Sequence, residues 1–413
     1  MISKVLRIAY FVFLASLVGC ANLAPLLSNP TPAPVSQATF TPQPFTISTP
    51  TALPVTAVRV LRVWLPPRFD PNADTESANL LKQRLADFET AHPGLKIDVR
   101  IKAEEGETSL LNALSITSSA APAALPDLIA LSRPDLELAA LKGLIHPVDG
   151  LSVFLDDPNW YPYARELGHI QNIGYGLPFA GDMLVLVHRP ELEINTWDEI
   201  LASEEPLLFT ANDPQSLVML SLYVSAGGKL VNEQGLPTLE EQPLTQTFTL
   251  IQAGVTAKTF SPSLLGYEAD AQTYQAYRNR SAKMVITWAV NELGIEDSVM
   301  QAIPNLNNSP YTFANGWVWA LAGSAPENQQ VATELAEFLM ADEFIGKWLG
   351  DTGYLPTRLS QDSNANTILE SAHALPASDV LVVLGPIMNQ ALSRLLNGEQ
   401  VEVVVRSVME QVK

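Results

Sequence analysis

The chain has 413 residues, of which 47% are hydrophobic and 16% charged, with a formal net charge of −20 and a single cysteine. The excess of carboxylates argues against binding nucleic acid and against lying flat on an anionic membrane, because both need basic patches. Acidity also simply keeps an exported domain soluble, and one cysteine leaves no partner for a disulfide within the chain.

The N-terminus is typical of a secretory signal that ends at a lipidation site. Lys4 and Arg7 supply positive charge, residues 8–17 are apolar, and a small residue precedes Cys20. The apolar segment is about half of the roughly 20 residues that a membrane-spanning helix needs. The pattern therefore predicts a lipoprotein signal peptide over residues 1–20 with lipidation at Cys20, rather than a buried, inert cysteine.

Residues 21–56 predict a disordered tether rich in proline, threonine and serine. No charged residue lies between Ala21 and Val58, and prolines recur throughout. Such a segment cannot bury enough apolar surface to offset the entropy of ordering it. As polyproline II it would reach on the order of 100 Å, at about 3.1 Å per residue, and lift a domain off a membrane. The alternative is a disordered tail that does not serve as a spacer.

The globular region that follows is long enough for two hydrophobic cores and begins with alternating strands and helices. Val58–Leu65 predicts a mostly buried strand, and Leu95–Ile101 alternates apolar and charged residues as a half-exposed strand does. The helix between them ends at His92-Pro93-Gly94. Pro126–Leu131 predicts another strand, and a helix follows from Pro134 to Gly143. Strands joined by helices in this order imply right-handed crossovers and a mainly parallel sheet.

The same alternation continues to the C-terminus without an internal repeat. Thr196 and Glu199 form a capping box, and Asp213 predicts the start of a helix that runs to Gly227. The remaining predicted elements are strands at 183–188, 284–288 and 318–321, helices ending near 280 and covering 331–339, and two helices after 379.

Four stretches carry a resemblance to a known family. They are Phe88–Pro93, Pro126–Ile129 with Leu141–Asp149, Gly176–Phe179 with Thr196–Ile200, and Ala336–Leu339 with Gly353–Arg358. In this order and spacing, the chain from Val58 onward resembles the bacterial extracellular solute-binding proteins of the maltose-binding type, the capture subunits of ABC sugar importers. Two steps depart from the family pattern, since Val187-His188-Arg189 replaces tyrosine-asparagine-lysine and Asn279-Arg280 replaces glycine-lysine.

The resemblance implies an α/β fold of type II periplasmic binding proteins, with two lobes of mainly parallel sheet flanked by helices and a ligand cleft between them. It places one lobe at residues 57–180 plus 301–345 and the other at 181–300 plus 346–413. The chain would pass between the lobes near 180–184, near 301–305 and once more late in the sequence. Hinge closure around the ligand is the expected motion.

Position and chemistry together predict the ligand-binding residues. Sugars present hydroxyl edges and C–H faces, so a sugar site needs aromatic platforms beside carboxylates and amides. Such sites lie at the carboxyl ends of strands in open α/β sheets. The predicted stacking surfaces are Trp64, Trp288, Trp317 and Tyr354, and the predicted hydroxyl partners are Asp182 and Asn315.

Other conspicuous residues are assigned to the framework. Trp319, Trp197 and Trp348 are expected to pack in the core. Arg358 fits a structural ion pair better than a ligand acid. The segment Asp70–Glu76 begins like a calcium loop but lacks the glycine and the final glutamate, so a turn and a helix cap explain it better.

Signals of catalysis are missing from the sequence. The five histidines show no metal-ligand spacing, and no nucleophile elbow, phosphate loop or dinucleotide fingerprint occurs. We therefore expect neither metal nor cofactor, although two carboxylates across a cleft can hydrolyse glycosides and a sequence does not exclude that arrangement.

Together these features predict a monomeric, non-enzymatic binding protein of an ABC importer. It would be lipid-anchored on the outer face of the cytoplasmic membrane, capture an oligosaccharide or glycoside, and deliver it to permease subunits. The alternatives are a surface sensor or adhesion protein with the same bilobal fold, and a secreted glycoside hydrolase.

Overall fold

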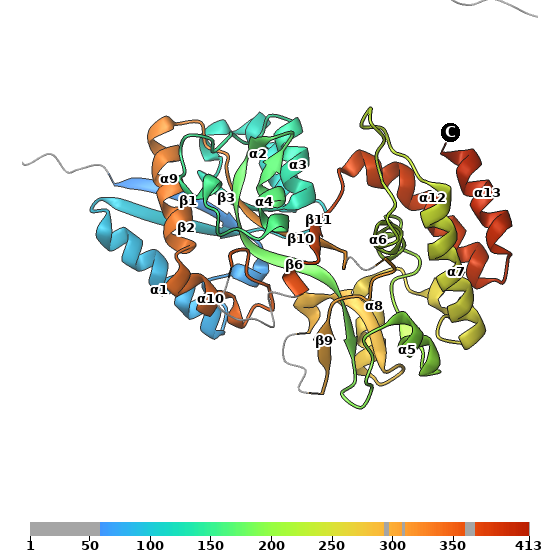
Figure 1. The fold of residues 1–413 in the computed structure, drawn as a ribbon. Helices are drawn as coiled ribbons and strands as arrows, with labels where there is room; N and C mark the ends of the chain where they lie inside the picture. The colour runs from blue at the N-terminus through green and yellow to red at the C-terminus, as the bar shows by residue number, and fades with distance from the viewer. Residues whose placement is uncertain (1–57, 293–296, 308–309, 360–367, 413) are drawn as a thin grey trace, which may run out of the picture. The chain divides into compact units, whose positions relative to one another are not determined.

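A computed structural model describes residues 58–292, 297–307, 310–359 and 368–412 (Figure 1). The predicted signal peptide, Cys20 and the whole of the predicted tether lie outside these residues.

The described part of the chain builds a nine-stranded sheet in the order β2-β1-β3-β10-β6-β8-β7, with β11 beside β10 and β9 beside β6. The strands are β1 Arg59–Leu65, β2 Leu95–Ile101, β3 Leu128–Ser132, β6 Gly176–His188, β7 Leu207–Leu208, β8 Met284–Trp288, β9 Val299–Gln301, β10 Thr312–Leu321 and β11 Ala372–Ala374. A separate hairpin pairs β4 His169–Ile170 with β5 Ile173–Gly174. The first three strands are parallel, as the crossover pattern predicts, and the α/β fold class is confirmed.

Strand β6 joins the two halves of the sheet. Its first part, up to Met183, pairs antiparallel with β10, and its last five residues pair antiparallel with β8. All thirteen residues are buried. The sequence pattern predicts only residues 183–188 of this strand, because Pro178 interrupts the apolar pattern of its first half. Pro178 lies at a register shift opposite Val318, where a missing N–H costs little.

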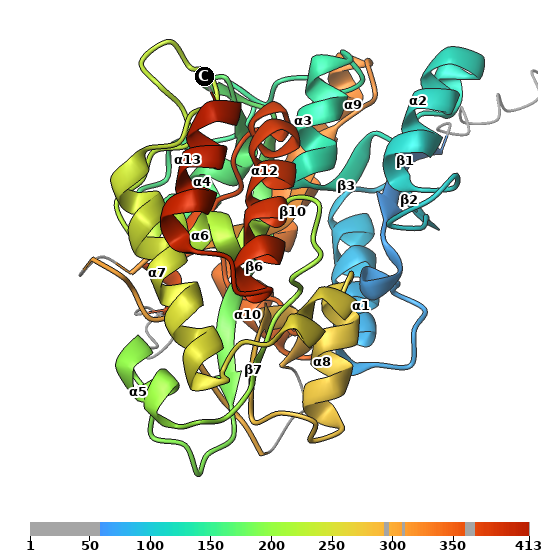
Figure 2. The ribbon, with the colours of Figure 1, turned by 90° about the vertical axis from the view of Figure 1, so that its right-hand side faces the viewer.

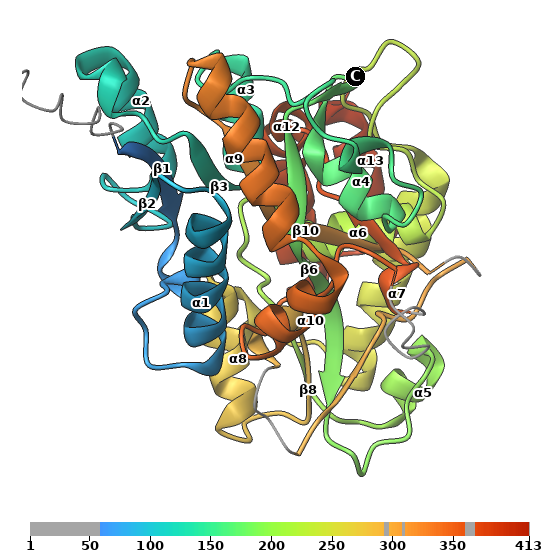
Figure 3. The same cartoon turned by 90° about the vertical axis from the view of Figure 1, so that its left-hand side faces the viewer.

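One group of helices packs beside β1, β2, β3 and β10. These helices are α1 Glu76–Ala91, α2 Leu110–Ala120, α3 Arg133–Leu141, α4 Pro162–Gly168, α9 Pro326–Leu339 and α10 Asp342–Gly350. Helix α1 contacts α9 and α10, and Figure 3 shows these three side by side. The Thr75 side chain caps α1 by accepting a hydrogen bond from the Ala78 amide at 3.1 Å. The segment from Asp70 is thus a turn and a cap, as predicted.

A second group of helices surrounds the far half of the sheet. It consists of α5 Trp197–Ala202, α6 Leu217–Ser225, α7 Glu241–Ala257, α8 Asp270–Arg278, α12 Ser378–Leu396 and α13 Val401–Gln411. Helix α12 is long and apolar enough to span a membrane by composition alone, yet it packs against α6, α7 and α13 as a core helix (Figure 2). The capping box of Thr196 and Glu199 forms as predicted.

Helix α6 begins later than the sequence pattern indicates. Asp213 lies outside it, and its carboxylate accepts hydrogen bonds from the amides of Gln215 at 2.9 Å and Leu217 at 3.0 Å. Ser216, at a φ of 52°, turns the chain before the first helical residue. Asp213 and the proline after it therefore form a turn and a cap before the helix, and not its first turn.

Short 3-10 turns connect several elements, and one of them contributes to an aromatic core. The turns are η1 Pro67–Phe69, η2 Pro122–Ala124, η3 Phe154–Asp156, η4 Pro262–Gly266 and η5 Ala289–Asn291. Phe179 stacks on Trp319 with ring centroids 4.3 Å apart and on Trp348 at 5.5 Å, and it meets Phe69 at 5.1 Å. Trp319 and Trp348 are buried, as predicted. Trp197 is also buried, and its indole N–H donates to the Pro304 carbonyl at 2.7 Å.

Candidate functional site

A cavity of about 710 Å³ opens where β6, β8 and β10 meet, and five of the six predicted ligand residues line it. These five are Asp182, Trp288, Asn315, Trp317 and Tyr354. The volume lies in the range of roughly 300 to 1,000 Å³ that small-molecule sites occupy.

Strand register explains why these side chains share one cavity. Asn315 on β10 lies directly opposite Asp182 on β6, and Trp288 on β8 lies opposite Leu184. Opposite residues in an antiparallel pair project from the same face, as do residues two apart in one strand. Asp182, Leu184, Trp288, Asn315 and Trp317 therefore lie on a single face of the sheet.

The expectation that Trp64 stacks on a ligand does not fit its place in the fold. Trp64 is 2% exposed and does not line the cavity. It lies on β1, between β2 and β3, and belongs to the buried hydrophobic core. The Lys102 ammonium lies 5.0 Å from the ring centroid. Trp64 is a core residue.

Two of the aromatic side chains form a fixed pair. The Trp317 indole N–H donates to the Tyr354 hydroxyl at 2.7 Å, which leaves the hydroxyl proton of Tyr354 free to donate. Phe69 packs edge-on against Trp317 at 6.1 Å, and the Arg68 guanidinium lies 5.5 Å from the Tyr354 ring centroid. Trp288 is half-buried at the end of β8, so part of its ring remains accessible.

Asp182 and Asn315 are held by the backbone around them. Asp182 is 8% exposed, and its Oδ1 accepts hydrogen bonds from the amides of Met183 at 2.9 Å and Val290 at 3.1 Å. Burial raises the pKa of the Asp182 carboxyl to about 8. The Asn315 side-chain oxygen accepts from its neighbour's amide, Gly316, at 2.8 Å, so its amide nitrogen is the group that can donate to a ligand.

Asp270 is a functional candidate that the sequence reasoning missed. Its Oδ2 accepts hydrogen bonds from the Thr287 hydroxyl at 2.9 Å and from the Asn291 amide at 2.5 Å. Burial raises the pKa of Asp270 to about 6. Two carboxyls with pKa values raised in one cavity are typical of a functional site.

Other cavity residues were also missed, most of them acidic. They are Arg68, Glu104, Glu105, Asp135, Asp213 and Glu268. Asp135 lies in the first turn of α3, Asp213 caps α6, and Asp270 opens α8. Acids at helix starts are the signal that points to three of the missed carboxylates, although that signal usually reflects capping alone.

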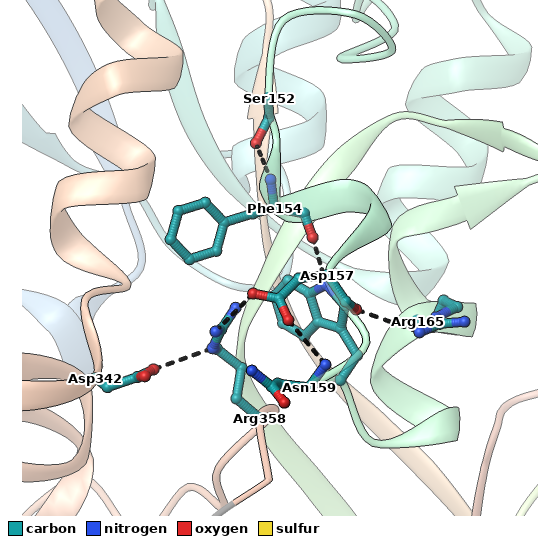
Figure 4. A network of polar contacts seen from close by, with 8 residues as sticks. Ser152, Phe154, Asp157, Asn159, Arg165, Asp342 and Arg358 are labelled. Carbon is teal, nitrogen blue, oxygen red and sulfur yellow. Dashed lines mark hydrogen bonds and ion pairs between the residues drawn. The ribbon is translucent and has the colours of Figure 1, made fainter.

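Arg358 forms a structural network away from the cavity, as predicted (Figure 4). Its Nη2 donates to Asp157 at 2.8 Å and its Nε donates to Asp342 at 3.1 Å, while its side chain is only 10% exposed. The guanidinium lies 4.8 Å from the centroid of Phe154 and 5.4 Å from that of Trp160. These contacts tie the segment before α4 to the segment after α10.

Replacing Arg358 with methionine is expected to lower the free energy of unfolding by about 1.5 kcal/mol. The reason is that the partly buried, charge-assisted hydrogen bond from Arg358 to Asp157 is lost. Urea denaturation measures the change. Arg100→Met removes a matched but exposed ion pair with Asp98 and should change stability by less than about 0.5 kcal/mol. Equal losses in both variants would show that the network adds nothing beyond a surface ion pair.

No group of three histidine, cysteine or carboxylate residues within the described ranges is arranged to hold a metal ion. The cavity thus offers aromatic faces, amides and carboxyls, which bind organic ligands by stacking and hydrogen bonding.

Comparison with known proteins agrees with this arrangement. The sequence model of a family described as bacterial extracellular solute-binding protein matches residues 83–376. No curated protein sequence matches the chain.

Solved structures of low sequence identity have the same fold. A maltose-bound MalE3 of T. maritima shares 15% identity with a TM-score of 0.62, over 86% of this chain and 98% of that one. The cyclic alpha-maltosyl-1,6-maltose binding protein of Arthrobacter globiformis shares 15% with a TM-score of 0.67, over 86% and 97%. The sugar-binding protein MalE of Xanthomonas citri shares 17% with a TM-score of 0.65, over 86% and 96%.

Proposed function

The chain belongs to the bacterial extracellular solute-binding protein family, and on that premise we propose that it captures a carbohydrate in the cavity around Asp182. The observation that carries the proposal is the cavity itself, which joins three aromatic rings to a carboxyl and an amide on adjacent strands. Aromatic faces suit the C–H patches of sugar rings, and the polar groups suit their hydroxyls. The similar structures from T. maritima and Xanthomonas citri are named for maltose or sugar binding, which supports this ligand class.

The mechanism that we propose is binding without chemistry. Two lobes would close on the ligand, and the closed state would be recognised by the permease of an ABC importer. A ligand shifts this equilibrium only by its better fit to the closed state. Lipidation at Cys20 and a tether over residues 21–56 would hold the monomeric protein at the outer face of the membrane.

The boundaries of the lobes also belong to this proposal. The change of partner along β6, from β10 to β8 after Met183, supports a passage between lobes near residues 180–184. The third passage we place between β11 and α12 instead of near residue 346. Trp348 packs on Phe179, and β11 pairs with β10, whereas α12 packs on α6 and α7.

A thermal-shift screen of the full chain tests the ligand class. A ligand that binds only the folded state raises the apparent melting temperature, by an amount equivalent to about 2.7 kcal/mol at a concentration 100 times the dissociation constant. We expect at least one oligosaccharide to raise it, with no new reducing ends after prolonged incubation. A shift with other solute classes but with no saccharide would contradict the carbohydrate assignment, and release of reducing ends would contradict binding without chemistry.

A further inference from the structure

The cavity is strongly unbalanced in charge. Seven carboxylate residues line it, against one basic residue, Arg68. The seven are Glu104, Glu105, Asp135, Asp182, Asp213, Glu268 and Asp270. The glutamates are exposed at the rim, whereas the aspartates are partly or fully buried. The Arg68 guanidinium is engaged elsewhere, since it donates to the Thr352 carbonyl at 3.1 Å and lies beside the Tyr354 ring.

Some of these carboxylates are held by hydrogen bonds within the protein, whereas one oxygen of Asp182 accepts no hydrogen bond from the described residues. Both oxygens of Asp213 cap α6, and Oδ2 of Asp270 is held by Thr287 and Asn291. Both hydrogen bonds of the Asp182 side chain end on Oδ1. Among the described residues none donates to its Oδ2 and none forms an ion pair with it, although Asp182 is 8% exposed and lines the cavity. Oδ2 of Asp182 is therefore a cavity-lining oxygen that a ligand donor can reach, and closing the cavity without such a donor would leave the oxygen unsatisfied.

A neutral ligand would leave this imbalance uncorrected. Closing the site over it would remove water from the carboxyl groups without adding a counter-charge for those that are ionised, which low-dielectric surroundings penalise. A protonated amine corrects the balance and donates up to three hydrogen bonds. The aromatic faces of Trp288, Trp317 and Tyr354 also attract such a cation. The carboxylates are not arranged to hold a metal ion within the described ranges, which favours a larger organic cation.

We propose that the cavity selects a saccharide that carries protonated amino groups, with one ammonium group donating to Oδ2 of Asp182. This inference rests on the proposed function and specifies the ligand class of the same site.

Ionisation of Asp182 gives the proposal a second readout. Burial holds the Asp182 pKa near 8, and the charged or titratable groups that face it are Asp270, Arg68, Tyr163 and Tyr354. An ammonium group favours the ionised carboxylate, so binding of a saccharide whose amines are already protonated, as at about pH 5.5, releases the Asp182 proton to the solvent. A neutral sugar that hydrogen-bonds to Asp182 can do so while the carboxyl keeps its proton, so its binding does not require proton release.

Isothermal titration of the full chain with three tetrasaccharides tests the inference. The probes are the β-1,4-linked tetramer of glucosamine, its fully N-acetylated form and maltotetraose. We expect the amine-bearing tetramer to bind at least about 10-fold more tightly than its N-acetylated form at 50 mM salt, with much of the advantage lost at 500 mM salt. Its binding heat should also differ between acetate and MES buffers at about pH 5.5, where the amines of the ligand are protonated before they bind, because the Asp182 proton is released.

Variants separate the role of Asp182 from general acidity. Asp182→Asn should reduce the preference for the amine-bearing tetramer about 10-fold and abolish the dependence on buffer. Glu233→Gln removes an exposed carboxylate outside the cavity and should leave the preference unchanged. An unchanged preference in Asp182→Asn would overturn the inference.

The remaining outcomes separate the two proposals. Equal or tighter binding of maltotetraose or the N-acetylated tetramer would overturn the amine preference while leaving carbohydrate capture intact. Binding of spermidine, a cation without a sugar ring, but of none of the three saccharides would overturn both the carbohydrate assignment and the amine-bearing saccharide.

Discussion

Replacing Trp288 with alanine is expected to weaken saccharide binding by at least about 30-fold, equivalent to about 2 kcal/mol, while the fold is retained. Trp288 ends β8, lines the cavity and is only half-buried, so its ring is available as a stacking surface. Loss of a large aromatic contact at the centre of a binding site commonly costs this much. Isothermal titration with the best ligand from the screen measures the effect, and urea denaturation checks stability.

The conservative variant sharpens this test. Trp288→Phe keeps a smaller aromatic face and should lose less than about 10-fold in affinity, since stacking depends on the area of the ring. Trp317 is a poorer test position because it is 6% exposed and donates to Tyr354, so its removal also disturbs the fold. Unchanged affinity in Trp288→Ala would mean that the ring does not contact the ligand.

The second large effect concerns the pH dependence of stability in the ligand-free protein. Burial raises the pKa of Asp182 to about 8, well above the value of about 3.9 in an unfolded chain. Between these values the folded state holds a proton that the unfolded state has released. The contribution of the neutral carboxyl is therefore complete below about pH 4 and falls by up to about 1.4 kcal/mol for each pH unit until about pH 8.

Asp182→Asn isolates this contribution. Asparagine keeps the shape and the acceptor for the amides of Met183 and Val290, but it does not titrate. We expect urea denaturation of the natural sequence to show a steeper loss of stability from pH 5 to pH 8 than the variant. Asp270, with its pKa raised to about 6, should add a slope below that value in both proteins. Parallel curves for the two proteins would show that Asp182 is ionised in the folded state at neutral pH.

The sequence predicts much of the fold because the local patterns agree with the tertiary structure. The parallel arrangement of β1, β2 and β3 follows from strands joined by helices. Strand β6 is the main exception, since Pro178 hides its first half in the sequence pattern. The late start of α6 has a related cause, because Asp213 lies in a turn before the helix and caps it by accepting a hydrogen bond from the amide of Leu217, its first residue.

The candidate site was predictable where strand alternation fixes the direction of a side chain. Asp182, Asn315 and Trp317 reach the cavity because of their register in β6 and β10. Trp64 lies in the core and does not line the cavity, and the sequence does not reveal this because a tryptophan at a strand end looks the same whether its strand is central or borders a cleft. Asp135 and Asp270 were missed because helices far apart in sequence bring them together, and only tertiary structure shows that they share one cavity.

A crystal structure of the complex with the tightest-binding saccharide tests the central claim most directly. We predict one saccharide in the cavity, with a sugar ring against Trp288 and a ligand donor within hydrogen-bonding distance of Oδ2 of Asp182. A saccharide bound elsewhere on the protein, with this cavity holding only solvent, would contradict the account.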